Sequence, residues 1–140
     1  MTNLSNQCLV AIDPGEKNIG VSYFDIHSKQ YLGSQLLSMN YDEFKVWVSR
    51  LYPLTVVIEQ QKPQSTYCRL VNFLDGFCYA RNIPFYRRRL QFGYNITYKE
   101  RKQKSIDLFL ERTNIALHPS TKLDDIADSF NLGFNFLHKK

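Results

Sequence analysis

The chain has 140 residues, of which 44% are hydrophobic and 22% are charged, and its formal net charge is +5. This length and composition suit one globular domain with its own core, and they exclude a fibrous, low-complexity or disordered chain. No apolar run approaches the length of about 18 residues that a membrane span requires, and the polar start lacks the pattern of a secretion signal. We therefore expect a single domain over residues 1–140 that stays inside a cell, makes no use of a membrane and binds an anionic partner.

Neither the cysteines nor the histidines form a metal-binding pattern. Cys8, Cys68 and Cys78 are odd in number and lie among apolar neighbours, as expected of reduced core thiols rather than a disulfide framework. The chain has no Cys-x-x-Cys pair, and its three histidines are scattered, so a zinc site is not favoured. Any bound metal would need carboxylate ligands.

The first part of the chain predicts three strands, a helix and a fourth strand. The predicted strands are Cys8–Ile12, Ile19–Ile26, Tyr31–Leu37 and Leu54–Ile58, and the predicted helix is Tyr41–Leu51, ended by Pro53. Short turns join the first three strands, which favours an antiparallel meander.

A helix with two apolar columns is predicted after Pro63. One column consists of Tyr67, Leu70, Val71, Leu74 and Cys78, and the other of Phe73, Phe77 and Ala80. Packing on one sheet face requires only one column. The second column indicates either additional core contact or the interface of a homodimer.

The rest of the chain predicts a strand and two helices. The strand is Ile83–Tyr86, and the helices are Lys104–Arg112 and Leu123–Leu137, the latter capped by Ser120 or Thr121. Strands come first and then alternate with helices. This order predicts an α/β fold with a mixed five-stranded sheet, in which the antiparallel meander continues into parallel strands, flanked by helices.

Acidic residues stand where such a fold would bring them together. Asp13 closes the first strand and Glu59 closes the fourth, while Asp125 and Asp128 share one side of the last helix. Acids in the first turn of a helix also suit its dipole and a solvated face, but the column continues into apolar Leu132. The residues alone thus leave open a metal-binding cluster and a structural acid cluster.

Three short motifs carry a resemblance to a known family. They are Ala11-Ile12-Asp13-Pro14-Gly15 followed by Asn18-Ile19-Gly20-Val21, then Val57-Ile58-Glu59-Gln60, and finally Asp125-Ile126-Ala127-Asp128-Ser129. In this order they resemble the RuvC-type Holliday junction resolvases of the RNase H-like superfamily. The run from Lys122 to Phe130 is most similar to the poxvirus branch. The resemblance implies an RNase H-like nuclease domain, a homodimer, and paired symmetrical nicks across a four-way DNA junction that leave 5′-phosphate and 3′-hydroxyl ends. It also implies a role in DNA recombination or in resolving replicated viral genome concatemers.

The resemblance also implies site residues. Asp13, Glu59, Asp125 and Asp128 become catalytic metal ligands for two Mg²⁺ ions, which Mn²⁺ can replace; we assign one ion mainly to Asp13 and Asp128 and the other to Asp13 and Glu59. Asp124 competes with Asp125 for its place. The family uses a lysine shortly before the helix that follows the fifth strand, and here Lys99, Lys102 and Lys104 qualify. We favour Lys102 as the catalytic lysine and expect no nucleotide cofactor.

Basic and aromatic residues alternate between the fifth strand and the helix after it. The basic residues that we expect to bind DNA phosphates are Arg87, Arg88, Arg89, Lys99, Arg101 and Lys104. A solvated basic face explains the same run. The aromatic residues are Tyr86, Phe92, Tyr94 and Tyr98, which either stack on unpaired bases at the crossover or fill the core.

Three other functions remain possible. Asp13-x-Gly15-x-x-x-x-Gly20 also resembles the phosphate loop of the actin-like ATPases, although those proteins need two such domains. A non-catalytic nucleic-acid-binding module, or a nuclease for RNA/DNA hybrids or flaps, would share the same fold. We expect a virus-encoded protein that acts in the host cell, or a protein of the cytoplasm or nucleoid if it is cellular.

Overall fold

The computed structural model describes residues 8–15, 18–38, 40–51, 55–60, 68–90, 95–113 and 123–139. Within these ranges the chain forms strands and helices in an alternating order. In sequence they are β1 (Cys8–Pro14), β2 (Asn18–Asp25), β3 (Tyr31–Ser38), α1 (Tyr41–Ser49), β4 (Thr55–Glu59), α2 (Cys68–Ala80), β5 (Phe85–Arg88), α3 (Tyr98–Thr113) and α4 (Leu123–Leu137).

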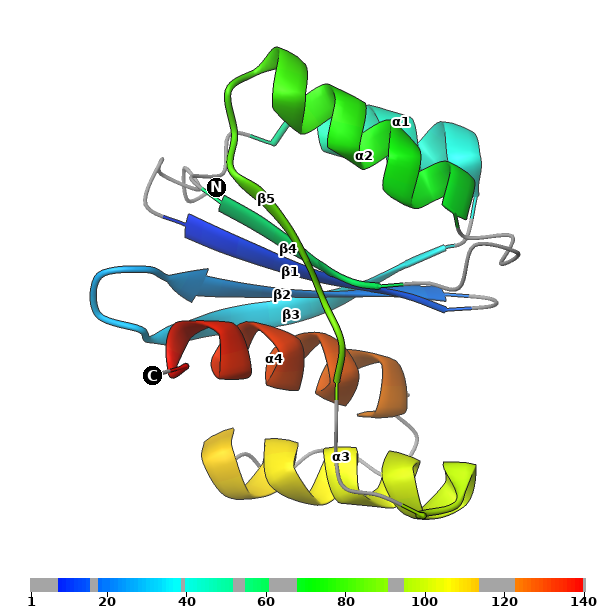
Figure 1. The fold of residues 1–140 in the computed structure, drawn as a ribbon, viewed down its shortest axis with the longest axis vertical. Helices are drawn as coiled ribbons and strands as arrows, with labels where there is room; N and C mark the ends of the chain where they lie inside the picture. Colours follow the sequence, from blue (N-terminus) through cyan, green and yellow to red (C-terminus); the bar gives the residue numbers. More distant parts are fainter. Residues whose placement is uncertain are drawn as a thin grey trace.

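The strands form one mixed sheet in the order β3-β2-β1-β4-β5. β1, β2 and β3 are antiparallel neighbours, and β4 and β5 continue the sheet in parallel. In Figure 1, α1 and α2 cover one face of the sheet, α4 covers the other, and α3 lies on the outer side of α4. The predicted meander with added parallel strands is confirmed.

The alternation of side chains along β1 determines which face receives the acidic residue at its end. Val10 and Ile12 belong to the core beneath α1 and α2, whereas Leu9 and Ala11 belong to the core beneath α4. Because side chains alternate along a strand, Asp13 faces α4. Val57 lies in the same core as Leu9, so Glu59 faces α4 as well.

α4 is covered on two sides, as the apolar flanks of its sequence predicted. It packs against β1 and β2 on one side and against α3 on the other. Gly133 allows the close approach to the sheet, because a Cβ at this position would collide with the Phe24 ring. Two polar residues of the helix, Ser129 and Asn131, are consequently buried together with their apolar neighbours.

Two predicted boundaries were wrong. The fifth strand is Phe85–Arg88 rather than Ile83–Tyr86, because the amide of Ile83 instead donates to the Cys78 carbonyl at the end of α2. α3 begins at Tyr98 rather than Lys104, because Thr97 and Glu100 form a reciprocal N-terminal cap. The predicted caps Ser120 and Thr121 and the aromatic residues Phe92 and Tyr94 lie outside the described residues.

The second apolar column of α2 packs against α1. The Phe73 ring lies 5.9 Å from the Tyr41 ring and 6.4 Å from the Phe44 ring, measured between centroids. Ala80, in contrast, is exposed. Core contact with α1 therefore accounts for Phe73, while the exposed Ala80 has no such contact to explain it and the homodimer stays a prediction.

The cysteines agree with their prediction as free thiols. None of the three forms a disulfide, and burial raises the pKa of both Cys8 and Cys78 to about 11. Thiols with such a pKa are protonated and unreactive at neutral pH. In the part of the chain that the structure describes, no helix is both long and apolar enough to cross a membrane.

Candidate active site

Three carboxylates from distant parts of the chain meet beneath α4. Asp13, Glu59 and Asp128 each contribute a carboxylate oxygen to a group in which all of these atoms lie within 4.8 Å of one another. Asp13 is only 6% exposed, and the other two are partly buried. Three of the four acids that the sequence motifs singled out thus form one compact cluster, which we call the acid cluster.

Strand register brings the first two acids together. Ile12 of β1 and Ile58 of β4 are direct partners in a parallel pair, so the residues that follow them lie side by side at the carboxyl edge of the sheet. Asp128 comes from the second turn of α4, which crosses this edge on the same face. The cluster therefore rests on two central strands and one buried helix, all of which are rigid elements.

Asp13 is strongly perturbed by its surroundings. Burial raises the pKa of Asp13 well above its ordinary value, and the neighbouring Glu59 carboxylate adds to the effect. The charges of Asp128 and Asp125 raise it further. A divalent cation would relieve this repulsion, because its positive charge would offset the negative charges of the acid cluster.

Asp128 is held by a chain of buried hydrogen bonds from α3. The Ser105 hydroxyl donates to Asp128 Oδ1 at 2.6 Å, and Asn131 Nδ2 donates to the Ser105 hydroxyl at 3.0 Å and to its carbonyl at 2.9 Å. Ser105 and Asn131 are both fully buried. This chain of hydrogen bonds orients the Asp128 carboxylate, which belongs to the group that could hold a metal ion.

The charge of Asp128 responds to two opposing sets of neighbours. Burial raises its pKa to about 6, with a further contribution from Glu59. The Ser105 hydroxyl and the positive charge of Arg101 act in the opposite direction. Arg101 therefore acts on the acid cluster electrostatically, in addition to any contact that it makes with DNA.

Asp125 lies beside the cluster but not within the group of three. Its Oδ1 lies 3.1 Å from the position that a Cβ would occupy at Gly15. At Gly20 a Cβ would collide with the Asp125 backbone carbonyl, so both glycines permit the start of α4 to close onto the β1–β2 turn. This close approach explains the Gly15 and Gly20 spacing without a bound nucleotide phosphate.

The neighbouring Asp124 points to α3 instead. Its Oδ2 accepts a hydrogen bond from Lys102 Nζ at 2.8 Å. Burial works to raise the pKa of Asp124, but the hydrogen bond and charge of Lys102 outweigh burial and hold that pKa below its ordinary value. The two adjacent aspartates thus have different neighbours. Asp124 pairs with Lys102, whereas Asp125 lies beside Gly15 at the end of β1.

Lys102 lies at the acidic end of α4. The hydrogen bond to Asp124 raises its pKa, and Nζ lies 4.8 Å from the centre of the Tyr98 ring. Lys99 and Lys104 are exposed. The family pattern had led us to expect the catalytic lysine shortly before this helix. All three lysines instead lie within α3.

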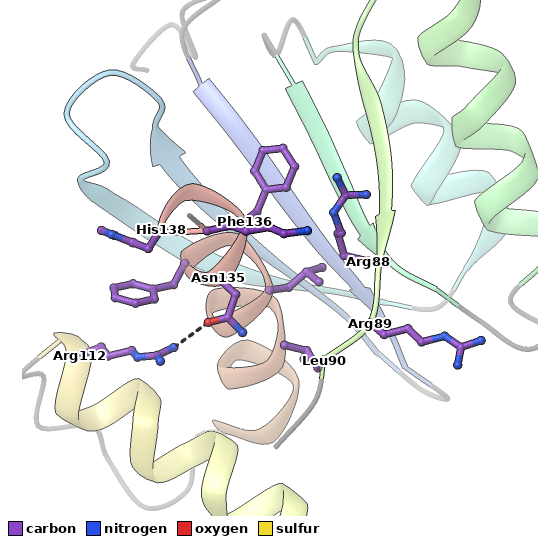
Figure 2. A pocket seen from close by; sticks show the side chains of 10 residues that line it. Arg88, Arg89, Leu90, Arg112, Asn135, Phe136 and His138 are labelled. Atoms are coloured by element: carbon purple, nitrogen blue, oxygen red, sulfur yellow. Dashed lines mark hydrogen bonds between the residues drawn. The ribbon is translucent and has the colours of Figure 1, made fainter. Parts of the chain in front are cut away.

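The three consecutive arginines do not share one surface. Arg87 faces α2, where it forms an ion pair with Asp75 at 2.8 Å. Arg88 faces the opposite side, with its guanidinium carbon 5.1 Å from the centre of the Tyr86 ring and 5.5 Å from that of Phe136. Figure 2 shows Arg88 and Arg89 at the edge of a pocket beside α4. Because successive side chains of a strand point to opposite faces, Arg87 and Arg88 lie on different sides of the sheet.

The predicted stacking tyrosines differ in how far they are exposed. Tyr98 is 63% exposed and lies next to Lys102. Tyr86 is 38% exposed and contacts the Phe136 ring, with the centroids 5.0 Å apart. Tyr98 therefore retains a surface that a base could contact, whereas Tyr86 is largely engaged with α4.

The donor set of the acid cluster fits a hard divalent cation. Its ligand atoms are all carboxylate oxygens, which are the ligands that Mg²⁺, Mn²⁺ and Ca²⁺ prefer over nitrogen or sulfur. Their mutual separation also suits ions that share a carboxylate, because such pairs lie about 4 Å apart. Burial and the neighbouring carboxylates raise the pKa of Asp13, and a bound cation would counter both effects.

Sequence reasoning missed Ser105 and Asn131. The only signal was the presence of a polar residue in an otherwise apolar column: Ser105 precedes Phe109 by one turn, and Asn131 lies between Phe130 and Leu132. A buried polar side chain needs a hydrogen-bond partner. That rule predicts that partners exist but does not identify them.

Comparison with known proteins identifies the family. Residues 7–140 match the family model described as Poxvirus A22 protein. The chain belongs to this family. A relative in fowlpox virus (strain NVSL), named Holliday junction resolvase, is 30% identical to this poxvirus A22 chain over 143 residues, which cover 92% of this chain and 91% of the relative. The Holliday junction resolvase of vaccinia virus (strain Ankara) is 27% identical, with 97% of this chain and 78% of the relative covered.

Solved structures support the same placement of this poxvirus A22 family member. The fowlpox virus resolvase in complex with its substrate Holliday junction DNA superposes with a TM-score of 0.79 and 26% identity, covering 93% of this chain and 96% of that chain. RuvC of Thermus thermophilus superposes with a TM-score of 0.60 and 13% identity, with 91% of each chain covered. The RuvC-type, RNase H-like fold predicted from the motifs is confirmed.

Proposed function

We propose that this chain is a Holliday junction resolvase: a metal-dependent crossover junction endodeoxyribonuclease that cuts four-way DNA junctions. The observation that carries this proposal is the convergence of Asp13, Glu59 and Asp128 within 4.8 Å at the edge of the sheet. Family membership supports the same activity, since the fowlpox virus relative is a Holliday junction resolvase. A bound divalent cation would offset the cost of grouping one buried and two partly buried carboxylates in this way.

Asp13, Glu59 and Asp128 would hold Mg²⁺, with Asp125 from the preceding turn of α4 as a further ligand. Bound magnesium ions would lower the pKa of a coordinated water and stabilise the leaving 3′-oxygen. Asp13 is influenced by the charges of both Glu59 and Asp128, which suits a ligand shared by two ions. The Ser105 hydroxyl holds Asp128 in one orientation, so the ligand set is preformed.

Lys102 would act on the scissile phosphate rather than on the three carboxylates of the acid cluster. Its ammonium group, positioned by Asp124, balances the negative charge that develops on the scissile phosphate. In the reaction the water oxygen bonds to phosphorus and the bond from phosphorus to the 3′-oxygen breaks. The products are a 5′-phosphate on one side and, once a proton has been taken up, a 3′-hydroxyl on the other.

The substrate and the assembly follow from the activity. Two symmetrical nicks across one junction require two active sites, whereas the described part of one chain holds one acid cluster. A homodimer with twofold symmetry supplies both. As a member of a poxvirus family, the protein acts on viral DNA in the host cell, in recombination or in the resolution of genome concatemers.

The test is incubation of the purified protein with an end-labelled four-way junction and Mg²⁺. We expect paired symmetrical nicks whose ends can be rejoined by DNA ligase, and loss of cutting in Asp13→Asn, which keeps the shape of the side chain but removes its charge. A plain duplex, a flap and an RNA/DNA hybrid are the comparison substrates. Preferential cutting of the hybrid or the flap, or equal cutting by Asp13→Asn, would refute the proposal.

A further inference from the structure

A positively charged pocket lies between the C-terminal half of α4, the end of β5 and the last turn of α3 (Figure 2). Its volume is about 530 Å³, within the range of sites that hold small ligands or parts of larger ones. Four of the residues around it are cationic, namely Arg88, Arg89, Arg112 and Lys139. None of the described residues that line it is acidic.

Two of these cations are fixed in place. The Arg112 guanidinium stacks 4.1 Å from the centre of the Phe134 ring and donates to Asn131 at 3.0 Å and to Asn135 at 3.3 Å. Arg88 stacks on Phe136, and its buried Nε has no hydrogen-bond partner among the described residues. Cations held in this way lose little further freedom when an anion binds.

The chemistry of the pocket favours phosphate over a nucleobase. Guanidinium groups match phosphate oxygens in geometry and charge. A base would need a free aromatic face, but Phe134 already contacts Arg112 and the His138 ring, whose centroid lies 4.1 Å away. Burial also lowers the pKa of Arg112, which indicates a partly dehydrated cation that an anion would stabilise.

The position of the pocket relates it to the acid cluster. Both lie on the α4 side of the sheet, and Arg88 is the direct strand partner of Glu59. Asn135, which lines the pocket, is two turns beyond Asp128 on α4, about 10 Å along the helix axis. Phosphates of one DNA strand advance by about 3.4 Å each along the duplex axis, so a strand that contacts both sites would place the pocket within a few nucleotides of the cleaved bond.

We propose that this pocket binds backbone phosphates of the DNA strand within a few nucleotides of the cleaved bond. The inference rests on the proposed function, because it takes the same DNA as ligand. It adds Arg112 and Lys139 to the DNA-contacting residues, and it separates Arg88 and Arg89 from Arg87, which is paired with Asp75 on the opposite face. Contacts of this kind strengthen binding without reading the base sequence.

The test measures how the affinity of the full-length chain for a four-way junction depends on salt concentration, in EDTA so that no cutting occurs. The variant Arg89→Gln/Lys139→Gln removes two exposed cations at the pocket. The control Lys45→Gln/Arg50→Gln removes the same charge from exposed positions at α1, on the other face of the sheet. We expect the pocket variant to lose about 1 to 2 from the slope of log affinity against log salt, and the control to keep the wild-type slope.

A second measurement locates the contact. A single neutral methylphosphonate linkage is placed in turn at each of the few positions next to the cleaved bond, and at the position that contacts the pocket it should weaken binding of wild-type protein several-fold. The same linkage should have no further effect on the pocket variant. Equal slopes for the two double variants, or an equal effect of the neutral linkage on wild type and pocket variant, would overturn the pocket proposal.

Wild-type cutting in Mg²⁺ is measured in parallel so that the two proposals can fail separately. A wild-type chain that cuts the junction while both double variants share its salt slope would refute the pocket alone. A wild-type chain that neither cuts nor binds the junction would refute the proposed function and the pocket together.

Discussion

Asp128 has a pKa that makes the stability of the metal-free protein depend on pH. Its pKa rises from the ordinary 3.8 to about 6 in the folded chain, chiefly because the carboxyl group is buried. The folded state therefore binds this proton more tightly than the unfolded state, and stability falls as pH rises from about 4 through 6. A shift of about two units corresponds to at most about 3 kcal/mol.

We accordingly expect Asp128→Asn to be more stable than wild type above pH 6 in EDTA, and to lose this advantage below pH 4. Urea unfolding at a series of pH values measures the difference. Mg²⁺ should stabilise wild type more than the variant, because the variant has lost one of the three carboxylates that would bind the cation. A constant difference at all pH values would contradict the assigned pKa.

Lys102 is expected to affect the chemical step more than DNA binding. Lys102→Met removes the ammonium group but keeps most of the side-chain length, and should lower the single-turnover cutting rate by roughly 10²-fold or more. Lys99→Met, at an exposed position on the same helix, should weaken binding while the rate at saturating protein stays near wild type. Equal rate losses in both variants would indicate a general loss of charge instead.

The residues of the acid cluster differ in how readily sequence reveals them. Asp13 and Glu59 end apolar runs, and strand order alone brings them to one edge. Asp128 follows from its motif. The partners Ser105 and Arg101 do not, because their position depends on how α3 docks on α4, which is a tertiary contact between two helices without a shared sequence signal.

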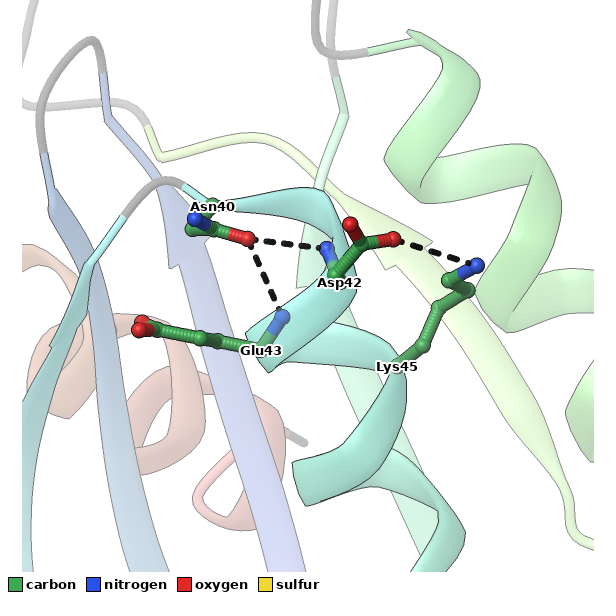
Figure 3. A network of polar contacts seen from close by, with 4 residues as sticks. All are labelled: Asn40, Asp42, Glu43 and Lys45. Atoms are coloured by element: carbon green, nitrogen blue, oxygen red, sulfur yellow. Dashed lines mark hydrogen bonds and ion pairs between the residues drawn. The ribbon is translucent and has the colours of Figure 1, made fainter.

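At the scale of elements, α1 depends on a well-formed N-terminal cap. The Asn40 side chain accepts hydrogen bonds from the amides of Asp42 at 3.0 Å and Glu43 at 3.1 Å, as Figure 3 shows. Asn40→Ala should lower the free energy of unfolding by about 1 kcal/mol, and Asn40→Ser should restore most of it. Urea unfolding measures both.

Junction cutting provides the control for this cap. α1 lies on the face of the sheet opposite the acid cluster, so the folded fraction of Asn40→Ala should cut at the wild-type rate. A reduced rate per folded molecule would show that α1 contributes to the active site or to the dimer.

Element boundaries were predicted well where the hydrophobic periodicity of the sequence defines them. They were predicted poorly where an N-terminal cap defines the start of a helix. α4 was predicted over its observed range, since its apolar residues continue to Leu137. The start of α3 was missed, although Thr97 and Glu100 have the spacing of a capping box. The polar and basic residues of its first two turns hide any amphipathic pattern.

For the whole molecule, the proposed dimer predicts the outcome of mixing active and inactive chains. Wild type and Asp13→Asn, refolded together, should form mixed dimers with one functional acid cluster. On a supercoiled cruciform plasmid these dimers should produce nicked circles, whereas wild type alone should produce linear DNA. The ratio of the two products on an agarose gel is the measurement. Linear product in proportion to wild type alone, without added nicked circles, would argue against two cooperating chains.

The architecture of the whole chain was the most predictable level. Three consecutive strands followed by alternating strands and helices are sufficient to place β1 and β4 side by side. The distribution of charge over the surface was not predictable in the same way. Arg87 and Arg88 are adjacent in sequence, but they face opposite sides of the sheet because both belong to β5 and successive side chains alternate along a strand.

The residues of the acid cluster lie far apart in the sequence and are therefore translated at different times. β1 and β4 carry Asp13 and Glu59, and they are translated long before α4 brings Asp128 and before α3 can hold it through Ser105. A nascent polypeptide that has emerged only as far as α3 has two carboxylates at the sheet edge but lacks the third. If the proposed function holds, a translation product that ends before α4 should therefore lack nuclease activity, because it has no Asp128.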